Sequence, residues 1–246
     1  MAARIAIYDN QQDRVDLPGL VVAALAGVEG TLLDAGSGTG THTLRLRRDR
    51  PDLRVVPLDL SLGMAPEVVG DLQALPLADG CVQAALALHV LYHVPDIALA
   101  VRELRRALAT DGVLVVGTNG SDDRFEIDAL WCGAVADATA LDVPAPTGDD
   151  RFTLSDGDLL REAFGSVEVQ DFVRRTVVPT AAPVVAYVDS MRAFASDQLP
   201  AGLDWDTFVV HVAARVEAEI TRTGAWRRTN HVGVFTCRGR SCRGRS

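Results

Sequence analysis

Three closely spaced glycines follow an acid in the segment Asp34-Ala35-Gly36-Ser37-Gly38-Thr39-Gly40. Glycine allows a backbone to approach a ligand closely and to take positive φ without a Cβ clash. A dinucleotide fingerprint needs another glycine at position 41, which is threonine here, and a P-loop needs a lysine, which the chain lacks altogether. The loop therefore predicts a ligand whose recognition does not depend on a pyrophosphate.

Two further acids lie at spacings that suit an adenosine-containing ligand. Asp59 ends the next apolar run, 25 residues after Asp34, and a carboxylate there can accept hydrogen bonds from both ribose hydroxyls. Asp71 and the backbone N–H of Leu72 follow a loop that contains Met64, and such a pair can read an adenine edge. The glycine loop, together with Asp59 and Asp71, therefore predicts an adenosine-containing ligand without a pyrophosphate.

Each of these acids also has a purely structural interpretation. Asp34 can cap the following helix or bind backbone amides of the turn rather than touch a ligand. Asp59 can be a solvated carboxylate at the end of a strand, and Asp71 an ordinary loop residue.

The histidines His89 and His93 are four residues apart, a spacing that resembles a pair of metal ligands. No acid or cysteine keeps the spacing of a third ligand, so we predict no metal and a structural, hydrogen-bonded His93. For His89 two roles stay open, general base or wall of the pocket.

The first half of the chain must position these residues, and it alternates short apolar runs with amphipathic helical patterns. This order predicts a doubly wound, mostly parallel sheet covered on both faces, with ligands at the carboxyl ends of the strands. One amphipathic helix should run over 97–109, opened by Asp96 and ended by Asp111 and Gly112. The predicted strands end near Leu33, Leu58, Leu88 and Gly117.

The second half carries a different pattern. A helix is expected within 121–142, then a loop over 143–150 and a short helix with Ser155 as its N-cap. An alternating strand over 167–178, helices over 184–194 and 205–223, and a last strand over 231–237 complete the prediction.

At this level of detail the sequence resembles a known family. The successive stretches DAGSGTG, PLDLSLGM, GDLQALPLADGCVQAALALHVLYHVPD and LATDGVLVVGTNG are similar to the ordered motifs of class I S-adenosylmethionine-dependent methyltransferases of the ubiquinone/menaquinone-biosynthesis-like type. The similarity spans about Thr31 to Asn119, roughly half the chain. It implies a Rossmann-like seven-stranded sheet with an antiparallel last strand, and S-adenosylmethionine as cofactor with S-adenosylhomocysteine as product.

The resemblance also implies roles for individual residues. Glycines of the loop would approach the methionine and ribose parts of the cofactor, Asp59 the ribose, and Asp71 with Leu72 the adenine. The N-terminal segment with Tyr8 would fold over the cofactor, and Leu88 and His89 would lie near its methionine end. The full predicted cofactor set is Tyr8, Asp34, Gly36, Ser37, Gly38, Gly40, Asp59, Leu60, Met64, Asp71, Leu72, Leu88 and His89.

Methyl transfer from a sulfonium mainly needs alignment and exclusion of water, because the methyl group is already electrophilic. An ammonium or alcohol acceptor must also lose a proton, and a histidine is a natural base near neutral pH. We therefore predict His89 as the catalytic residue, with Tyr8 or His211 as alternatives.

The charge of the chain is uneven. Its formal net charge is -9, which disfavours binding to a nucleic-acid backbone. Residues 121–158 hold ten acids and two arginines, beginning with Asp122 and Asp123. Because acceptors bind after the fourth strand in the family, we hypothesise a polar, cationic small-molecule acceptor methylated on N or O; the alternative is a solvated acidic face.

We expect one methyltransferase domain over 1–237, with a core over about 20–120 and 151–237. A substrate cap would comprise 121–150 and the helices of 184–223, and 238–246 would form a disordered Arg/Gly tail. The chain shows no membrane span and no signal peptide, which predicts a cytoplasmic monomer or homodimer. Cys81 and Cys132 are expected to be buried.

Lysine-free, alanine- and arginine-rich usage favours a high-GC bacterium, and hence an enzyme of specialised metabolism. Three alternatives remain: an RNA methyltransferase using the arginines of the tail, a non-catalytic cofactor-binding subunit, and an enzyme that uses the sulfonium for a reaction other than methyl transfer.

Overall fold

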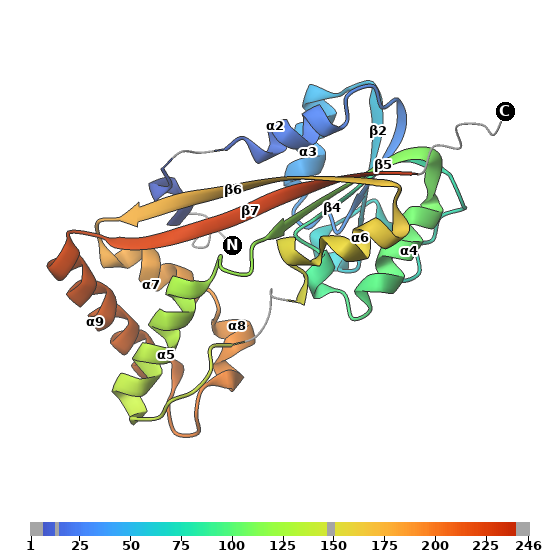
Figure 1. The fold of residues 1–246 in the computed structure, drawn as a ribbon. Helices are drawn as coiled ribbons and strands as arrows, with labels where there is room; N and C mark the ends of the chain where they lie inside the picture. Colours follow the sequence, from blue (N-terminus) through green and yellow to red (C-terminus); the bar gives the residue numbers. More distant parts are fainter. Residues whose placement is uncertain (1–6, 13–14, 147–150, 240–246) are drawn as a thin grey trace. The chain divides into compact units, whose positions relative to one another are not determined.

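The computed structural model describes residues 7–12, 15–146 and 151–239. Figure 1 shows the fold and the labels of its elements. The strands are β1 (Gly30–Ala35), β2 (Leu53–Asp59), β3 (Val68–Val69), β4 (Val82–Leu88), β5 (Leu108–Asn119), β6 (Ser166–Val178) and β7 (Trp226–Arg238). The α-helices are α2 (Leu17–Ala24), α3 (Thr41–Asp49), α4 (Ile97–Ala107), α5 (Phe125–Thr139), α6 (Gly157–Ala163), α7 (Ala181–Asp189), α8 (Arg192–Ala195) and α9 (Trp205–Thr223). Short 3-10 turns are η1 (Ile7–Asn10), η2 (Leu62–Met64), η3 (Leu91–His93), η5 (Leu154–Asp156) and η6 (Ser196–Gln198).

The strands form one seven-stranded sheet in the order β3-β2-β1-β4-β5-β7-β6. All pairs from β3 to β5 are parallel, and β7 runs antiparallel to β5. Because β1, β2 and β4 are parallel, their carboxyl ends share one edge of the sheet, and the strand order reverses beside β1. The predicted fold class, a doubly wound, mostly parallel sheet with an antiparallel last strand, is confirmed.

The chain divides into two compact units, to which β6 and β7 each contribute residues. We call residues 15–121, 148–172 and 232–246 the core unit. The helical unit comprises residues 1–14, 122–147 and 173–231.

Both faces of the sheet are buried within the core unit. Along β1 and β5, alternate residues join different apolar clusters: Leu33 and Leu114 pack toward α4 and α6, and Leu32 and Val115 pack toward α2 and α3. Alternation with period two places successive side chains on opposite faces of a strand. The continuous apolar runs of the sequence are therefore explained by helices on both faces (Figure 1).

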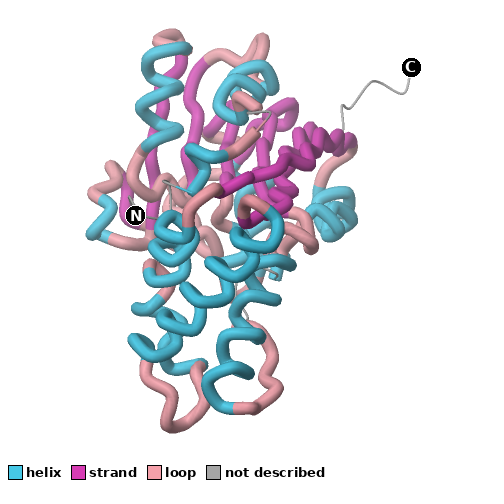
Figure 2. The backbone as a smooth tube through the Cα atoms, turned by 90° about the vertical axis from the view of Figure 1, so that its left-hand side faces the viewer, coloured by secondary structure: helices cyan, strands magenta, loops and turns pink. Residues whose placement is uncertain are grey.

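The helical unit has its own aromatic core. Trp131 of α5 lies 4.5 Å from Phe208 of α9 between ring centroids, and Trp205 lies 5.3 Å from Phe208. Residues of α7 and α8 join the same cluster, and Figure 2 shows these helices in cyan. Large rings that interlock at such distances account for much of the apolar burial in a small helical unit.

Several predicted boundaries are wrong. The helix expected over 97–109 ends at Ala107, because Leu108 already pairs with Val82 as the start of β5. The helix expected over 184–194 is split into α7 and α8, with the Ser190 hydroxyl donating to the carbonyl of Tyr187 at the break. Cys81 is exposed rather than buried, since the buried part of β4 begins one residue later at Val82, and Cys132 of α5 is only half-buried.

The expected N-cap at Ser155 is also wrong. Thr153 is the capping residue: its hydroxyl accepts from the amide of Ser155 at 3.2 Å, and Asp156 accepts from the Thr153 amide at 2.7 Å. This reciprocal arrangement is a capping box, and it precedes α6 by one short turn.

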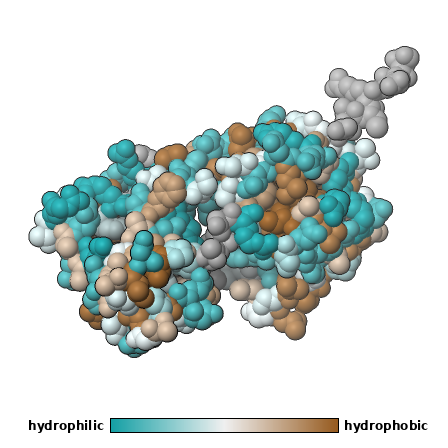
Figure 3. Space-filling view, turned by 60° about the horizontal axis from the view of Figure 1, so that its bottom comes forward, coloured by the Kyte–Doolittle hydropathy of each residue, from teal (hydrophilic) through white to brown (hydrophobic). Residues whose placement is uncertain are grey.

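Apolar residues also reach the surface. On the face shown in Figure 3, brown hydrophobic areas are separated by teal hydrophilic ones.

Within the described residues, no helix combines the length and the apolar character that crossing a membrane requires.

The capping box predicts unequal effects of two neighbouring substitutions. Thr153→Val keeps the shape of the side chain but removes the cap, so the free energy of unfolding should fall by about 1 kcal/mol. Ser155→Ala, the matched control, should change it by less than about 0.5 kcal/mol. Urea unfolding of both variants checks this, and a larger loss for Ser155→Ala would contradict the capping assignment.

Candidate active site

The glycine loop connects β1 to α3 at the carboxyl edge of the sheet. Gly36, Gly38 and Gly40 have φ of 74°, 52° and 75°, a left-handed conformation that other residues adopt only at a cost. The amides of Gly36 and Ser37 both donate to the carbonyl of Leu58, at 2.8 and 3.0 Å. The turn is therefore fastened to the end of β2.

The three glycines face different surroundings. A Cβ on Gly36 would lie 2.3 Å from a methyl carbon of Val90, so this glycine is needed for packing against the segment after β4. A Cβ on Gly38 or Gly40 would meet no described heavy atom within 4 Å. Gly38 and Gly40 thus border the open side of the loop, where a ligand can approach the backbone.

Asp59, the last residue of β2, contacts the glycine loop through its side chain. Its carboxylate accepts from the amide of Gly38 at 2.9 Å and from the amide of Ser61 at 2.9 Å. A carboxylate offers about four acceptor positions, so about two are left for the hydroxyl donors of a ligand. This spare capacity matches the pair of hydroxyls on a ribose.

Asp34, by contrast, lies inside the core unit. Its side chain is 2% exposed and accepts from the hydroxyl of Thr43 on α3. Burial raises the pKa of Asp34, and burial lowers the pKa of the neighbouring His42. The carboxylate of Asp34 thus has a partner within the protein, joining β1 to α3, and its contact with a ligand stays a prediction.

Asp71 and Leu72 lie in the loop after β3, next to the end of β2, where Val69 pairs with Asp59. The Asp71 carboxylate accepts from the amide of Gln73 at 2.8 Å. The side chain of Leu72 is 4% exposed and belongs to the apolar core, so only its backbone can serve a ligand.

His89 follows β4 in a left-handed conformation, with φ of 54°, which is uncommon for a residue with a Cβ. Its amide donates to the carbonyl of Gly117 at 2.8 Å, which fixes this turn to the end of β5. Such strained backbone is frequent where a side chain is held at a functional site. His93 is exposed and its ring meets that of Tyr92 edge-on at 4.5 Å.

The remaining predicted residues have different settings. Leu60 and Met64 are 69% and 39% exposed beside the end of β2, and together with Leu62 they offer apolar surface to a ligand. Leu88 is half-buried at the end of β4. Tyr8 lies in η1 of the helical unit, and its side chain is outside the described residues.

The sequence analysis missed three residues at this edge: His42, Gln73 and Val90. Each is adjacent to a predicted motif, but none has a residue type that by itself indicates a ligand. Among the residues that the structure describes, no group of three His, Cys, Asp or Glu side chains is placed to hold a metal ion.

Comparison with known proteins decides the family. The model of a methyltransferase domain matches residues 33–116. The malonyl-[acyl-carrier protein] O-methyltransferase of Laribacter hongkongensis is 31% identical over 240 residues, covering 88% of this chain and 74% of the relative. That of Geobacter sulfurreducens is 31% identical over 190 residues, covering 69% of each. The chain belongs to the class I S-adenosylmethionine-dependent methyltransferases.

Solved structures show the same methyltransferase fold. The protein BH2331 of Bacillus halodurans superposes with a TM-score of 0.59 at 17% identity, covering 91% of this chain and 98% of that one. Phosphoethanolamine N-methyltransferase 2 of Haemonchus contortus, in complex with S-adenosylmethionine, gives 0.54 at 13% identity, covering 97% and 56%. The cofactor of the methyltransferase is S-adenosylmethionine.

The residues of the core unit fit this cofactor. Spare acceptor positions on Asp59 suit the ribose, the open side of Gly38 and Gly40 suits close approach, and exposed Leu60 and Met64 suit an apolar base. When bound, the cofactor supplies a methyl group that is electrophilic without further activation. The protein's task is then to hold the acceptor in line and to exclude water.

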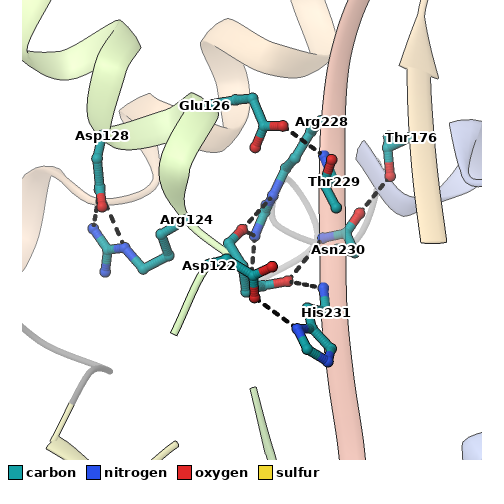
Figure 4. A network of polar contacts seen from close by, with 10 residues as sticks. Asp122, Arg124, Glu126, Asp128, Thr176, Arg228, Thr229, Asn230 and His231 are labelled. Carbon is teal, nitrogen blue, oxygen red and sulfur yellow. Dashed lines mark hydrogen bonds and ion pairs between the residues drawn. The ribbon is translucent and has the colours of Figure 1, made fainter. Parts of the chain in front are cut away.

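The acidic segment of this methyltransferase is largely paired within the protein. Asp123, 6% exposed, lies 2.8 Å from the guanidinium of Arg228, which is 2% exposed, and also accepts from the amide of His231 at 2.8 Å. Asp122 contacts the ring of His231 at 2.6 Å, in the same network (Figure 4).

Other acids of the segment have partners too. Asp128 lies 3.1 Å from Arg124, and Asp137 lies 3.2 Å from Arg215. Asp158 pairs with Arg161 at 2.9 Å. Asp149 and Asp150 lie outside the described residues, as do Arg240, Arg243 and Arg245 of the tail.

Arginines from beyond the segment offset part of its charge. Arg161, Arg215 and Arg228 all lie outside residues 121–158, and they pair with Asp158, Asp137 and Asp123. Because these three acids already have a guanidinium partner within the protein, the argument for a cationic acceptor, which counted their full charge, is weakened.

The buried pair predicts a strong dependence of stability on Asp123. Asp123→Ala would leave the buried Arg228 without this carboxylate, and the free energy of unfolding should fall by about 3–5 kcal/mol. Asp137→Ala removes an acid from a half-exposed pair with Arg215 and should cost at most about 1 kcal/mol. Denaturant unfolding tests the difference; equal losses would show that the Asp123 pair is not a stabilising element.

Proposed function

We propose that this methyltransferase transfers the methyl group to an oxygen of a carboxylate on a small acidic acyl substrate. The observation that carries the proposal is the extent of similarity to the Laribacter hongkongensis protein, which is named for O-methylation of malonyl-[acyl-carrier protein]. That similarity covers 88% of the chain, far beyond residues 33–116 of the methyltransferase domain. It must therefore include much of the helical unit, which contains most of the expected substrate cap.

The paired acids of the helical unit support the same choice. Asp122, Asp123, Asp128 and Asp137 each have a cationic or histidine partner in that unit. A cationic acceptor would have to compete with these partners, and a carboxylate acceptor makes no such demand.

Proton chemistry separates the possible acceptors. A carboxylate is already ionised at neutral pH, so its methylation needs no general base. An amine or an alcohol must lose a proton, and in that case His89 is the candidate base. On the carboxylate hypothesis His89 serves as a positioned wall of the site.

An acceptor panel with methyl-labelled S-adenosylmethionine tests the proposal. Malonyl-[acyl-carrier protein], malonyl-coenzyme A and free dicarboxylic acids should yield label that mild base releases, as expected for a methyl ester. Label that resists base and is found only with amine acceptors would overturn the proposal.

The same assay separates the two roles of His89. His89→Asn suits the left-handed backbone, since asparagine tolerates that conformation. With a carboxylate acceptor, turnover should fall by less than about tenfold, whereas loss of a general base costs about 100- to 10,000-fold. A loss in the larger range would contradict a base-free reaction.

A further inference from the structure

The amide group of Gln73 joins the start of α4 to the carboxylate of Asp71. Its Oε1 accepts from the backbone amide of Asp96 at 2.9 Å. Its Nε2 lies 3.1 Å from Oδ2 and 3.3 Å from Oδ1 of Asp71, and its own backbone amide donates to Oδ1 at 2.8 Å. Asp96 is at the same time the N-cap of α4, through the amide of Leu99 at 2.8 Å.

Chemistry fixes the direction of this chain of hydrogen bonds. A backbone N–H can only donate, so the Gln73 atom that faces Asp96 must be the carbonyl oxygen. The NH₂ group then necessarily faces Asp71 and can only donate. Two donors, the backbone and side-chain amides of Gln73, therefore face the Asp71 carboxylate and fix its orientation.

The loop that carries Asp71 is also held by contacts that do not involve Gln73. Glu103 of α4 accepts from the amide of Leu75 at 3.0 Å, and Arg106 donates to the carbonyl of Leu77 at 2.8 Å. Glu103 and Arg106 pair with each other at 2.8 Å. Removal of the Gln73 amide should consequently leave the loop in place and change mainly the carboxylate.

We propose that Gln73 is a positioning residue that sets the preference of the site for a 6-aminopurine over a 6-oxopurine. By fixing the orientation of the Asp71 carboxylate, with a lone pair of Oδ2 still available, it makes the carboxylate a partner for an exocyclic amino group. A purine with a carbonyl at that position would place two acceptors against each other. The inference rests on the assignment of Asp71 to the adenine edge.

Calorimetry with two product-like ligands tests this inference. S-adenosylhomocysteine and its 6-oxo analogue, S-inosylhomocysteine, differ at this purine substituent. We define the preference as the Kd of S-inosylhomocysteine divided by the Kd of S-adenosylhomocysteine. This ratio should be about tenfold smaller in Gln73→Leu than in the unchanged protein, which corresponds to about 1.4 kcal/mol. An unchanged ratio would overturn the role of Gln73.

Gln83→Leu is the matched control. Gln83 also accepts from a backbone amide through its Oε1, that of Thr31 at 2.8 Å, but it lies at the amino end of β4. Its removal should leave both Kd values unchanged. A thermal unfolding midpoint for each variant shows whether the substitutions differ in stability.

A charge substitution adds a readout that a merely structural role would not produce. In Gln73→Glu the new carboxylate can still accept from the Asp96 amide, but it cannot donate to Asp71 and repels it. The ratio of the Kd of S-inosylhomocysteine to that of S-adenosylhomocysteine should therefore fall at least as far as in Gln73→Leu. A ratio equal to that of the unchanged protein would contradict the proposal.

Asp71→Ala separates failure of the inference from failure of its premise. If this variant binds S-adenosylhomocysteine as tightly as the unchanged protein, Asp71 does not contact the adenine, and both its assignment to the adenine edge and the role of Gln73 are refuted. If Asp71→Ala weakens binding while Gln73→Leu keeps the ligand preference, the assignment of Asp71 to the adenine edge is supported. Only the positioning role of Gln73 is then refuted.

Discussion

The hydrogen bond from the Gly38 amide to the Asp59 carboxylate, at 2.9 Å, joins two strand ends on which the proposed cofactor site depends. It forms only because the loop after β1 turns through left-handed glycines and can bend toward the end of β2. The same turn brings Gly36 against Val90, after β4. Three neighbouring strand ends are thus locked together before any ligand is bound, and such preorganisation lowers the entropy that binding must overcome.

The rest of the core unit extends this principle. Parallel register aligns β1, β2, β3 and β4, and side chains of α4 fasten the loop after β3 through Glu103 and Arg106. The electrophile comes from the cofactor, so the enzyme's contribution is position rather than activation. The proposed site of backbone amides, carboxylates and a glutamine amide suits that task, because each of these groups has a defined direction.

The fold class could be predicted from the sequence because it depends on local patterns, and the same patterns indicated the sheet edge at which the cofactor site is proposed. Apolar runs of strand length, the glycine loop and the strand-end acid Asp59 are all readable within a few residues. The pairing of Asp123 with Arg228 was not predictable in this way, since the partners are 105 residues apart. Gln73 was missed because an amide becomes informative only when both of its ends have partners, and Thr153 because Ser155 is an equally good capping type.

Calorimetric titration of S-adenosylhomocysteine into the full chain and into Asp59→Ala tests the central claim most directly. Asp158→Ala, which removes a 91% exposed acid of the core unit, is the control. If Asp59 holds both the glycine loop and the ribose, its loss should weaken binding by about 100-fold, which is about 2.7 kcal/mol, with Asp158→Ala unchanged. Equal affinities for the unchanged protein and Asp59→Ala would contradict the account.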